Sequence, residues 1–229
     1  MHPLAHGFAA WAGATRSPGA AVLADPPFDA ELAPELIGTA VAFHYINRMV
    51  TILASPSPFP GPRALRPLTT RIAPRLFARA VKRPKVAGDS LRFLERAEPP
   101  EDMGWAKGSP PVAAAFAGFI AAIEDEAHEA TGRDARAVVQ ARVGAWSGED
   151  QELSRAWVEA AITELSEPEA AAARLALLAA LAQHQIDDAA VAAYHRHEPS
   201  DRRLLALLAW SSAQAARRVG ACLTSRRSM

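Results

Sequence analysis

The amino-acid sequence predicts an all-α fold, and three observations support that prediction. Apolar residues recur at helical spacing through most of the chain, while the alternation typical of strands is nearly absent. Hydrophobic residues make up 50% of the 229 residues, enough for a sizeable core. Stretches rich in proline and glycine separate the helical segments. The length suits a single domain, 1–229, or two small packed halves.

The first half of the chain contains one short and one long predicted helix, at 4–15 and 31–53. Pro34 falls in the first turn of the long helix, where a missing backbone N–H costs little. Loops are expected on either side of the long helix, at 16–29 and 54–62. A basic segment, 63–85, comes next, and its helical part is expected at 74–83.

The second half is more regular, with six predicted helices. The loop 99–110 bears several prolines and glycines, so we place a boundary there between halves 1–98 and 111–223. Ser166 and Ser200 are predicted helix caps. The helices at 35–50 and 174–189 are weakly alike, which is compatible with an internal duplication. The expected helices are 111–131, 134–145, 151–165, 167–186, 187–195 and 200–223.

Charge and cysteine content exclude several classes of function. Acidic and basic residues balance, giving a formal net charge of zero, so no global charge draws the chain to nucleic acid. No uninterrupted apolar run reaches the ~20 residues of a membrane span, and the N-terminus lacks a secretory signal. We therefore expect a cytoplasmic protein. Its single cysteine, Cys222, excludes an internal disulfide and a two-thiol redox centre within the chain.

The long helix at 31–53 is the most informative segment. Residues 36–43 are apolar or small on every face, which is typical of a buried helix. The helix then carries His44, Tyr45, Asn47 and Arg48 near its end, a pattern that suggests the floor of a pocket. Successive residues of a helix lie about 100° apart, so His44 and Asn47 can meet while His44 and Tyr45 face different directions.

Residues 34–50, with the phrase Ala-Phe-His-Tyr-Ile-Asn-Arg-Met-Val at 42–50, resemble the core helix of the alkylhydroperoxidase D-like, or carboxymuconolactone decarboxylase-like, family. The resemblance implies an all-α fold and a homo-oligomer. Peroxidases of that family carry a Glu, a Cys-x-x-Cys pair and a relay His. An ungapped alignment places these groups on Glu35, Asn47, Val50 and Ala54, so three of the four are replaced.

The resemblance implies a degenerate redox site without thiol peroxidase activity. Any catalysis would be acid–base chemistry on a small molecule by Glu35 with His44 or Tyr45. Asn47, Arg48 and His184 are the candidate pocket residues. No cofactor is expected, and His184 with Asp187 and Asp188 forms no firm metal ligand set, since the two carboxylates diverge on a helix.

Other interpretations stay open. The chain could be a non-enzymatic helical scaffold or a small-ligand-binding protein, with Glu35 serving only as a first-turn acid favoured by the helix dipole. Arg48 could hold a carboxylate ligand or pair with an acid of a neighbouring subunit. A second alternative is anion or membrane-surface binding through the stripe Arg71–Arg83, whose arginines recur every four residues.

Overall fold

The computed structural model describes residues 3–17, 19–54 and 86–225, and over these ranges every regular element is helical. The α-helices are α1 (Pro3–Ala14), α2 (Ala33–Leu53), α4 (Pro110–His128), α5 (Arg133–Ala145), α6 (Ala156–Ile162), α7 (Glu167–Leu181), α8 (Asp188–His195) and α9 (Asp201–Ser225). Short 3₁₀ turns occur at Ala21–Ala24, Ala30–Leu32, Asp89–Phe93, Glu101–Ala106 and Gln183–Gln185. The all-α prediction is confirmed for these residues.

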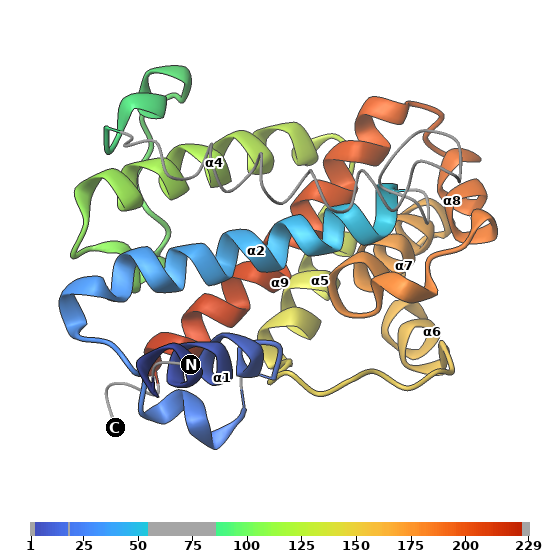
Figure 1. Cartoon of the computed structure of the whole chain (residues 1–229). Coiled ribbons are helices and arrows are strands. Elements are labelled where there is room, and N and C mark those ends of the chain that lie inside the picture. The colour runs from blue at the N-terminus through green and yellow to red at the C-terminus, as the bar shows by residue number, and fades with distance from the viewer. Residues whose placement is uncertain (1–2, 18, 55–85, 226–229) are drawn as a thin grey trace, which may run out of the picture.

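Helices α2 and α9 form the centre of the molecule. In Figure 1, α2 runs across the middle of the view with α4 alongside it, while α9 crosses behind. The packing of α2 on α9 is the most extensive contact between two elements among the described residues. Because α9 also packs on α4, α5 and α7, it links the N-terminal and C-terminal parts of the chain.

Two hydrophobic clusters lie along α9. One is built by helices α5 to α8 with the first half of α9, where Leu207 and Trp210 are fully buried. The other joins α1, α2 and α4 to the second half of α9, where Val219 and Leu223 are buried. One continuous helix therefore supplies side chains to both clusters, which fixes the relative position of the elements around the candidate site.

The predicted helix boundaries hold for most elements, and two helices and one loop need correction. The helix expected at 151–165 is only α6, Ala156–Ile162, because Gly148 turns the chain with a φ of 104° and the side chain of Ser154 accepts from the backbone N–H of Ala156. The helix expected at 167–186 ends at Leu181, since Ala182 leaves the helical conformation at φ −147°.

The third correction concerns the expected linker at 99–110. Residues Glu101–Ala106 form a 3₁₀ turn whose Met103 and Trp105 are buried among α2, α4 and α9. This stretch therefore belongs to the core, although its prolines and glycines are typical of a loop. The division into two halves stays a prediction, and the expected basic helix 74–83 and the stripe Arg71–Arg83 lie outside the described residues.

The predicted caps give mixed results. Ser200 accepts a hydrogen bond from the backbone N–H of Arg203 at the start of α9. Ser166 lies at the N-cap of α7 but its hydroxyl donates to the Glu169 carboxylate instead of accepting from the backbone. Asp187 caps α8 by accepting a hydrogen bond from the backbone N–H of Ala190.

Helix α2 is also the longest apolar helix. Among the described residues, only the stretch Ala30–Leu53 is long and apolar enough to cross a membrane by length and composition, with 22% of the relevant window buried. The core helix of a soluble protein meets the same criterion. Here α2 packs along one side on α9, and it carries a row of exposed apolar side chains on another, namely Phe43, Ile46, Val50 and Leu53.

Candidate functional site

A polar pocket of about 530 Å³ opens beside the C-terminal half of α2. It brings together four of the residues predicted from the sequence, His44, Asn47 and Arg48 from α2 and His184 from the turn after α7. The other lining residues come from the end of α1, from the segment after α5 and from the end of α7. They are Arg16, Trp146, Glu149, Asp150, Gln151, Leu153, Leu181 and Gln183.

Arg48 is the buried cation of this pocket, with only 7% of its surface exposed. Its Nε donates to the carbonyl oxygen of Ala180 at 2.8 Å, and one terminal nitrogen donates to the carbonyl of His44 at 3.0 Å. The guanidinium carbon lies 6.0 Å from the centre of the Trp146 ring. Burial lowers the pKa of Arg48 to about 10, so the side chain is a cation at neutral pH.

The bond from Arg48 to Ala180 satisfies a backbone carbonyl at the C-terminal end of α7. The last four carbonyls of a helix have no partner within the helix. Ala180 supplies one of these carbonyls, and the Arg48 side chain satisfies it across 132 residues of sequence. A cation at a helix C-terminus is favoured by the helix dipole. The same contact thus caps the end of α7 and positions the guanidinium.

His44 lies half-buried next to Arg48, and its hydrogen bonding defines its tautomer. The Thr15 hydroxyl donates its only hydrogen to the carbonyl of Ala12 at 2.8 Å, while its oxygen is 2.9 Å from Nε2 of His44. The Nε2 atom must therefore donate to Thr15, which leaves Nδ1 unprotonated. Burial, and then the charge of Arg48, lowers the pKa of His44 to about 4, so the imidazole is neutral at pH 7.

The mouth of the pocket is more exposed and carries charges of both signs. Asn47, His184, Arg16 and Asp150 are all exposed. The Glu149 carboxylate accepts from the backbone N–H and the hydroxyl of Ser147, so part of its hydrogen-bonding capacity is used locally. The base of the pocket is therefore formed by the buried Arg48 cation and the neutral imidazole of His44. The exposed part carries an amide, a histidine and two carboxylates.

Glu35 lies elsewhere. It is exposed in the first turn of α2, where its carboxylate accepts a hydrogen bond from Ser109 at 3.2 Å. It lines a separate, shallow hollow of about 310 Å³ with residues of α4. The structure thus does not bring Glu35 into one pocket with His44 or Tyr45, and its position matches a first-turn acid stabilised by the helix dipole.

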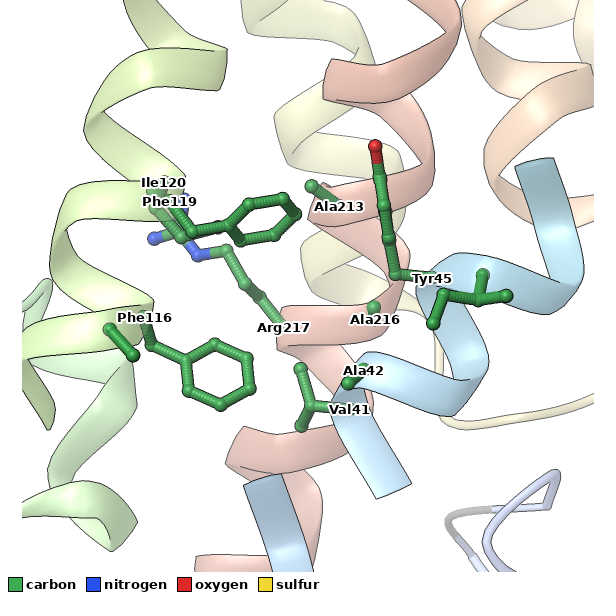
Figure 2. Close-up of a pocket in the computed structure, with 11 residues that line it drawn as sticks. Val41, Ala42, Tyr45, Phe116, Phe119, Ile120, Ala213, Ala216 and Arg217 are labelled. Carbon is green, nitrogen blue, oxygen red and sulfur yellow. The ribbon is translucent and has the colours of Figure 1, made fainter. Parts of the chain in front are cut away.

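Tyr45 points to the opposite side of α2, into an apolar pocket of about 300 Å³ between α2, α4 and α9. Figure 2 shows its ring beside α9, facing Phe119 of α4. The two rings meet edge to face, with centroids 5.0 Å apart. Burial raises the pKa of the Tyr45 hydroxyl.

Arg217 is the cation at the edge of the apolar pocket, and it is neutralised. It pairs with Asp102 at 2.8 Å and with Glu124 at 3.4 Å. Glu124 also accepts from Trp210 and Gln214 and pairs with Arg136. The acidic run at 124–129 therefore has arginine partners within the chain, since Glu126 and Glu129 pair with Arg202 and Arg203.

Comparison with known proteins agrees with the resemblance seen in the long helix. The chain is similar to an alkyl hydroperoxide reductase. It is 37% identical over 213 residues to the protein named alkyl hydroperoxide reductase Rv2159c from Mycobacterium tuberculosis. The match covers 93% of this chain and 60% of that relative's length. No family model matches the chain, and no solved structure matches it.

The ungapped alignment assigns the peroxidase thiols to Asn47 and Val50 and the relay His to Ala54. Asn47 lines the polar pocket, whereas Val50 and Ala54 are exposed and line neither pocket. Cys222 lies half-buried in the last turns of α9, and it lines neither pocket as well. Of these four residues, only Asn47 lines the polar pocket of this chain.

Sequence reasoning missed several pocket residues. Thr15 fixes the tautomer of His44, and Trp146 forms the wall beside Arg48. Both lie far from α2 in sequence, and both follow directly after the end of a helix, at α1 and α5. No spacing pattern connects such positions to α2. The one available signal is the occurrence of a polar or aromatic residue at a helix end.

Proposed function

We propose that this protein is an alkylhydroperoxidase D-like, or carboxymuconolactone decarboxylase-like, helical protein that binds a small molecule in the polar pocket of α2 and does not reduce peroxides by a two-thiol mechanism. The pocket on His44 and Arg48 carries this proposal, because it gathers buried and exposed polar groups from four segments of the chain. Its volume lies within the ~300–1,000 Å³ typical of ligand pockets.

The chemistry that the base of the pocket supports is proton transfer next to a developing negative charge. The unprotonated Nδ1 of His44 is a proton acceptor, and the adjacent Arg48 cation would stabilise an anion formed beside it. His44 has a low pKa, so it is a weak base that would act only on an activated proton. Glu35 takes no part in this proposal because of its position outside the pocket.

A peroxidase assay tests the absence of thiol chemistry. Wild type and Cys222→Ser are supplied with an organic hydroperoxide and a dithiol reductant, and peroxide loss is followed. We expect turnover no faster than in the protein-free control for both proteins, since the chain has one cysteine and it lies outside the pocket. Robust turnover that disappears in Cys222→Ser would contradict the proposal.

A fragment screen tests the pocket itself. The indole N–H resonance of Trp146 reports on the pocket wall, and Trp146→Phe assigns that resonance. We expect small polar fragments to shift it while the indole of Trp210, buried in the other cluster, stays unchanged. A diverse screen without a single binder at Trp146 would favour the alternative, a non-enzymatic helical scaffold.

Self-association of this chain is a further part of the proposal. Phe43, Ile46, Val50 and Leu53 form an exposed apolar row along α2, each more than half exposed. Rows of this kind mark contact surfaces between proteins. Sedimentation of wild type and of Phe43→Glu with Val50→Glu tests it: we expect an oligomer that the double variant dissociates. A wild type that stays monomeric at tens of micromolar would refute this part.

A further inference from the structure

The Arg48 guanidinium is a buried cation whose protein partners are all neutral. Its hydrogen-bond acceptors are two backbone carbonyls, and its third neighbour is the face of Trp146. A charged group that is more than nine-tenths buried is costly unless an opposite charge accompanies it. The partial negative charge at the end of α7 compensates a fraction of a unit charge. The rest is uncompensated.

No Asp or Glu side chain of the described residues supplies the missing anion. Its sequence holds 25 Asp and Glu residues, and all of them fall within the described ranges, because 55–85 and the other residues left undescribed contain none. None of the ion pairs formed by these carboxylates involves Arg48. No side-chain carboxylate of this protomer therefore neutralises Arg48.

The groups around Arg48 restrict the size and charge of a partner. The Trp146 ring and the half-buried Leu181 provide apolar surface close to the guanidinium. Glu149 and Asp150 lie at the same pocket and would repel a second negative charge on a ligand. The neutral His44 adds no positive charge, so one anionic group on a compact, partly apolar molecule fits best.

We propose that the polar pocket binds a small organic monocarboxylate. Its oxygens accept hydrogen bonds from the remaining N–H groups of Arg48, and its organic part lies against Trp146. This inference rests on the proposed function, since it names the ligand class of the same pocket. A planar guanidinium and a carboxylate match in geometry, and hydrogen bonds between such charged groups are short and strong.

Titration with benzoate and its neutral counterpart benzamide tests the inference on the full-length protein. The two probes have nearly the same shape and differ in charge. Binding is followed through the Trp146 indole resonance and by calorimetry. We expect benzoate to bind and benzamide to bind at least about tenfold more weakly, since a hydrogen bond to a charged group contributes about 1.5–3 kcal/mol.

Variants of Arg48 test whether this residue is responsible for benzoate binding. In Arg48→Gln, verified as folded by its circular dichroism and melting curve, benzoate affinity should fall about 10- to 100-fold. Arg48→Lys keeps the positive charge but loses the planar pair of N–H donors, so it should retain part of the benzoate affinity. Arg202→Gln removes an exposed arginine that pairs with Glu126 and does not line the polar pocket, so it should leave benzoate affinity unchanged.

The wild type offers a test that needs no variant. Benzoate is ionised at every pH above about 5, and His44 does not change its charge between pH 6 and 9. Affinity should therefore be constant over that range and be lost as the pH rises through about 10, where Arg48 deprotonates.

Three results would overturn the inference: equal affinity for benzamide, unchanged benzoate affinity in a folded Arg48→Gln, or no binding of benzoate at all. The last result is expected if an acid of a second copy already occupies the site. The fragment screen keeps these failures separate from failure of the proposed function. Neutral fragments that shift Trp146 would leave the pocket standing as a ligand site and reject only the carboxylate.

Discussion

The two pockets beside α2 differ in whether their arginine is paired with acidic residues. Arg217 at the apolar pocket is neutralised by Asp102 and Glu124, and the rest of that pocket is aliphatic or aromatic apart from the Tyr45 hydroxyl. Arg48 at the polar pocket has carbonyls and an indole for neighbours. The half-buried Arg217 thus has two acids as partners, whereas the buried Arg48 has none among the described residues, which is consistent with packing at the first and binding at the second.

This difference arises within a single turn of helix. His44 and Tyr45 are adjacent in sequence, yet they line opposite pockets because successive helical residues lie about 100° apart. His44, Asn47 and Arg48, spaced three and four apart, share one side. The contrast predicts that variants of the two pockets will separate stability from ligand binding.

The largest effect is expected from Phe119→Ala in the apolar pocket. The variant removes the aromatic contact with Tyr45 and enlarges an existing cavity. We expect unfolding free energy to fall by about 3 kcal/mol, measured by urea denaturation. Benzoate affinity should stay at the wild-type value. An equal loss of affinity would show that the two pockets are coupled.

Low pH should decrease the unfolding free energy of the protein through protonation of His44. Its pKa is about 4 in the folded protein against an ordinary value of 6.5, so the unfolded chain binds a proton first as the pH falls. The unfolding free energy is therefore unaffected by protonation of His44 above pH 6.5. It decreases by about 2–3 kcal/mol as the pH falls towards 4.

The matched variant for this effect is His44→Gln. Carboxylates also titrate in this range, so the informative quantity is the difference in unfolding free energy between wild type and His44→Gln at each pH. That difference should change with pH between 6.5 and 4. A difference that stays constant would mean that His44 titrates normally in the folded protein.

Thr15→Val should have a smaller effect. It leaves the Nε2–H of His44 without its acceptor, at a cost of about 1 kcal/mol in unfolding free energy. Thr163→Val serves as the control, because that exposed hydroxyl bonds only to carbonyls of its own helix turn. Equal melting temperatures for Thr15→Val and wild type would argue against the assigned tautomer.

Asp150→Asn should give the smallest change, and one of opposite sign. Removing an exposed negative charge at the polar pocket should strengthen benzoate binding about twofold at low salt. Stability should be unchanged. Weaker binding in Asp150→Asn would indicate that the aspartate contacts the ligand directly.

Much of the fold was predictable because periodicity reports directly on helices. The long helix at 31–53 and the start of α7 follow from apolar spacing and an early proline. The end of α7 at Leu181 was not predictable, because the apolar spacing continues past it and the Arg48 side chain that bonds to its last turn is 132 positions away. Likewise, the buried Met103 and Trp105 lie in a stretch whose prolines and glycines are typical of a linker.

The candidate site was predictable on α2 and much less so elsewhere. Helical spacing alone groups His44, Asn47 and Arg48. The grouping of Glu35 with them came from the family resemblance, and Glu35 lies nine positions before His44, near the other end of α2. Thr15 meets His44 and Trp146 lines the pocket only through tertiary packing, so no local pattern reveals them.

The bond between Arg48 and Ala180 has a consequence for folding kinetics. The two residues lie 132 positions apart, so the base of the pocket closes only when distant parts of the chain have met. Such a contact is expected to form late on the folding pathway. A ligand held there would stabilise the native state without affecting the transition state, and would therefore slow unfolding while leaving the folding rate unchanged.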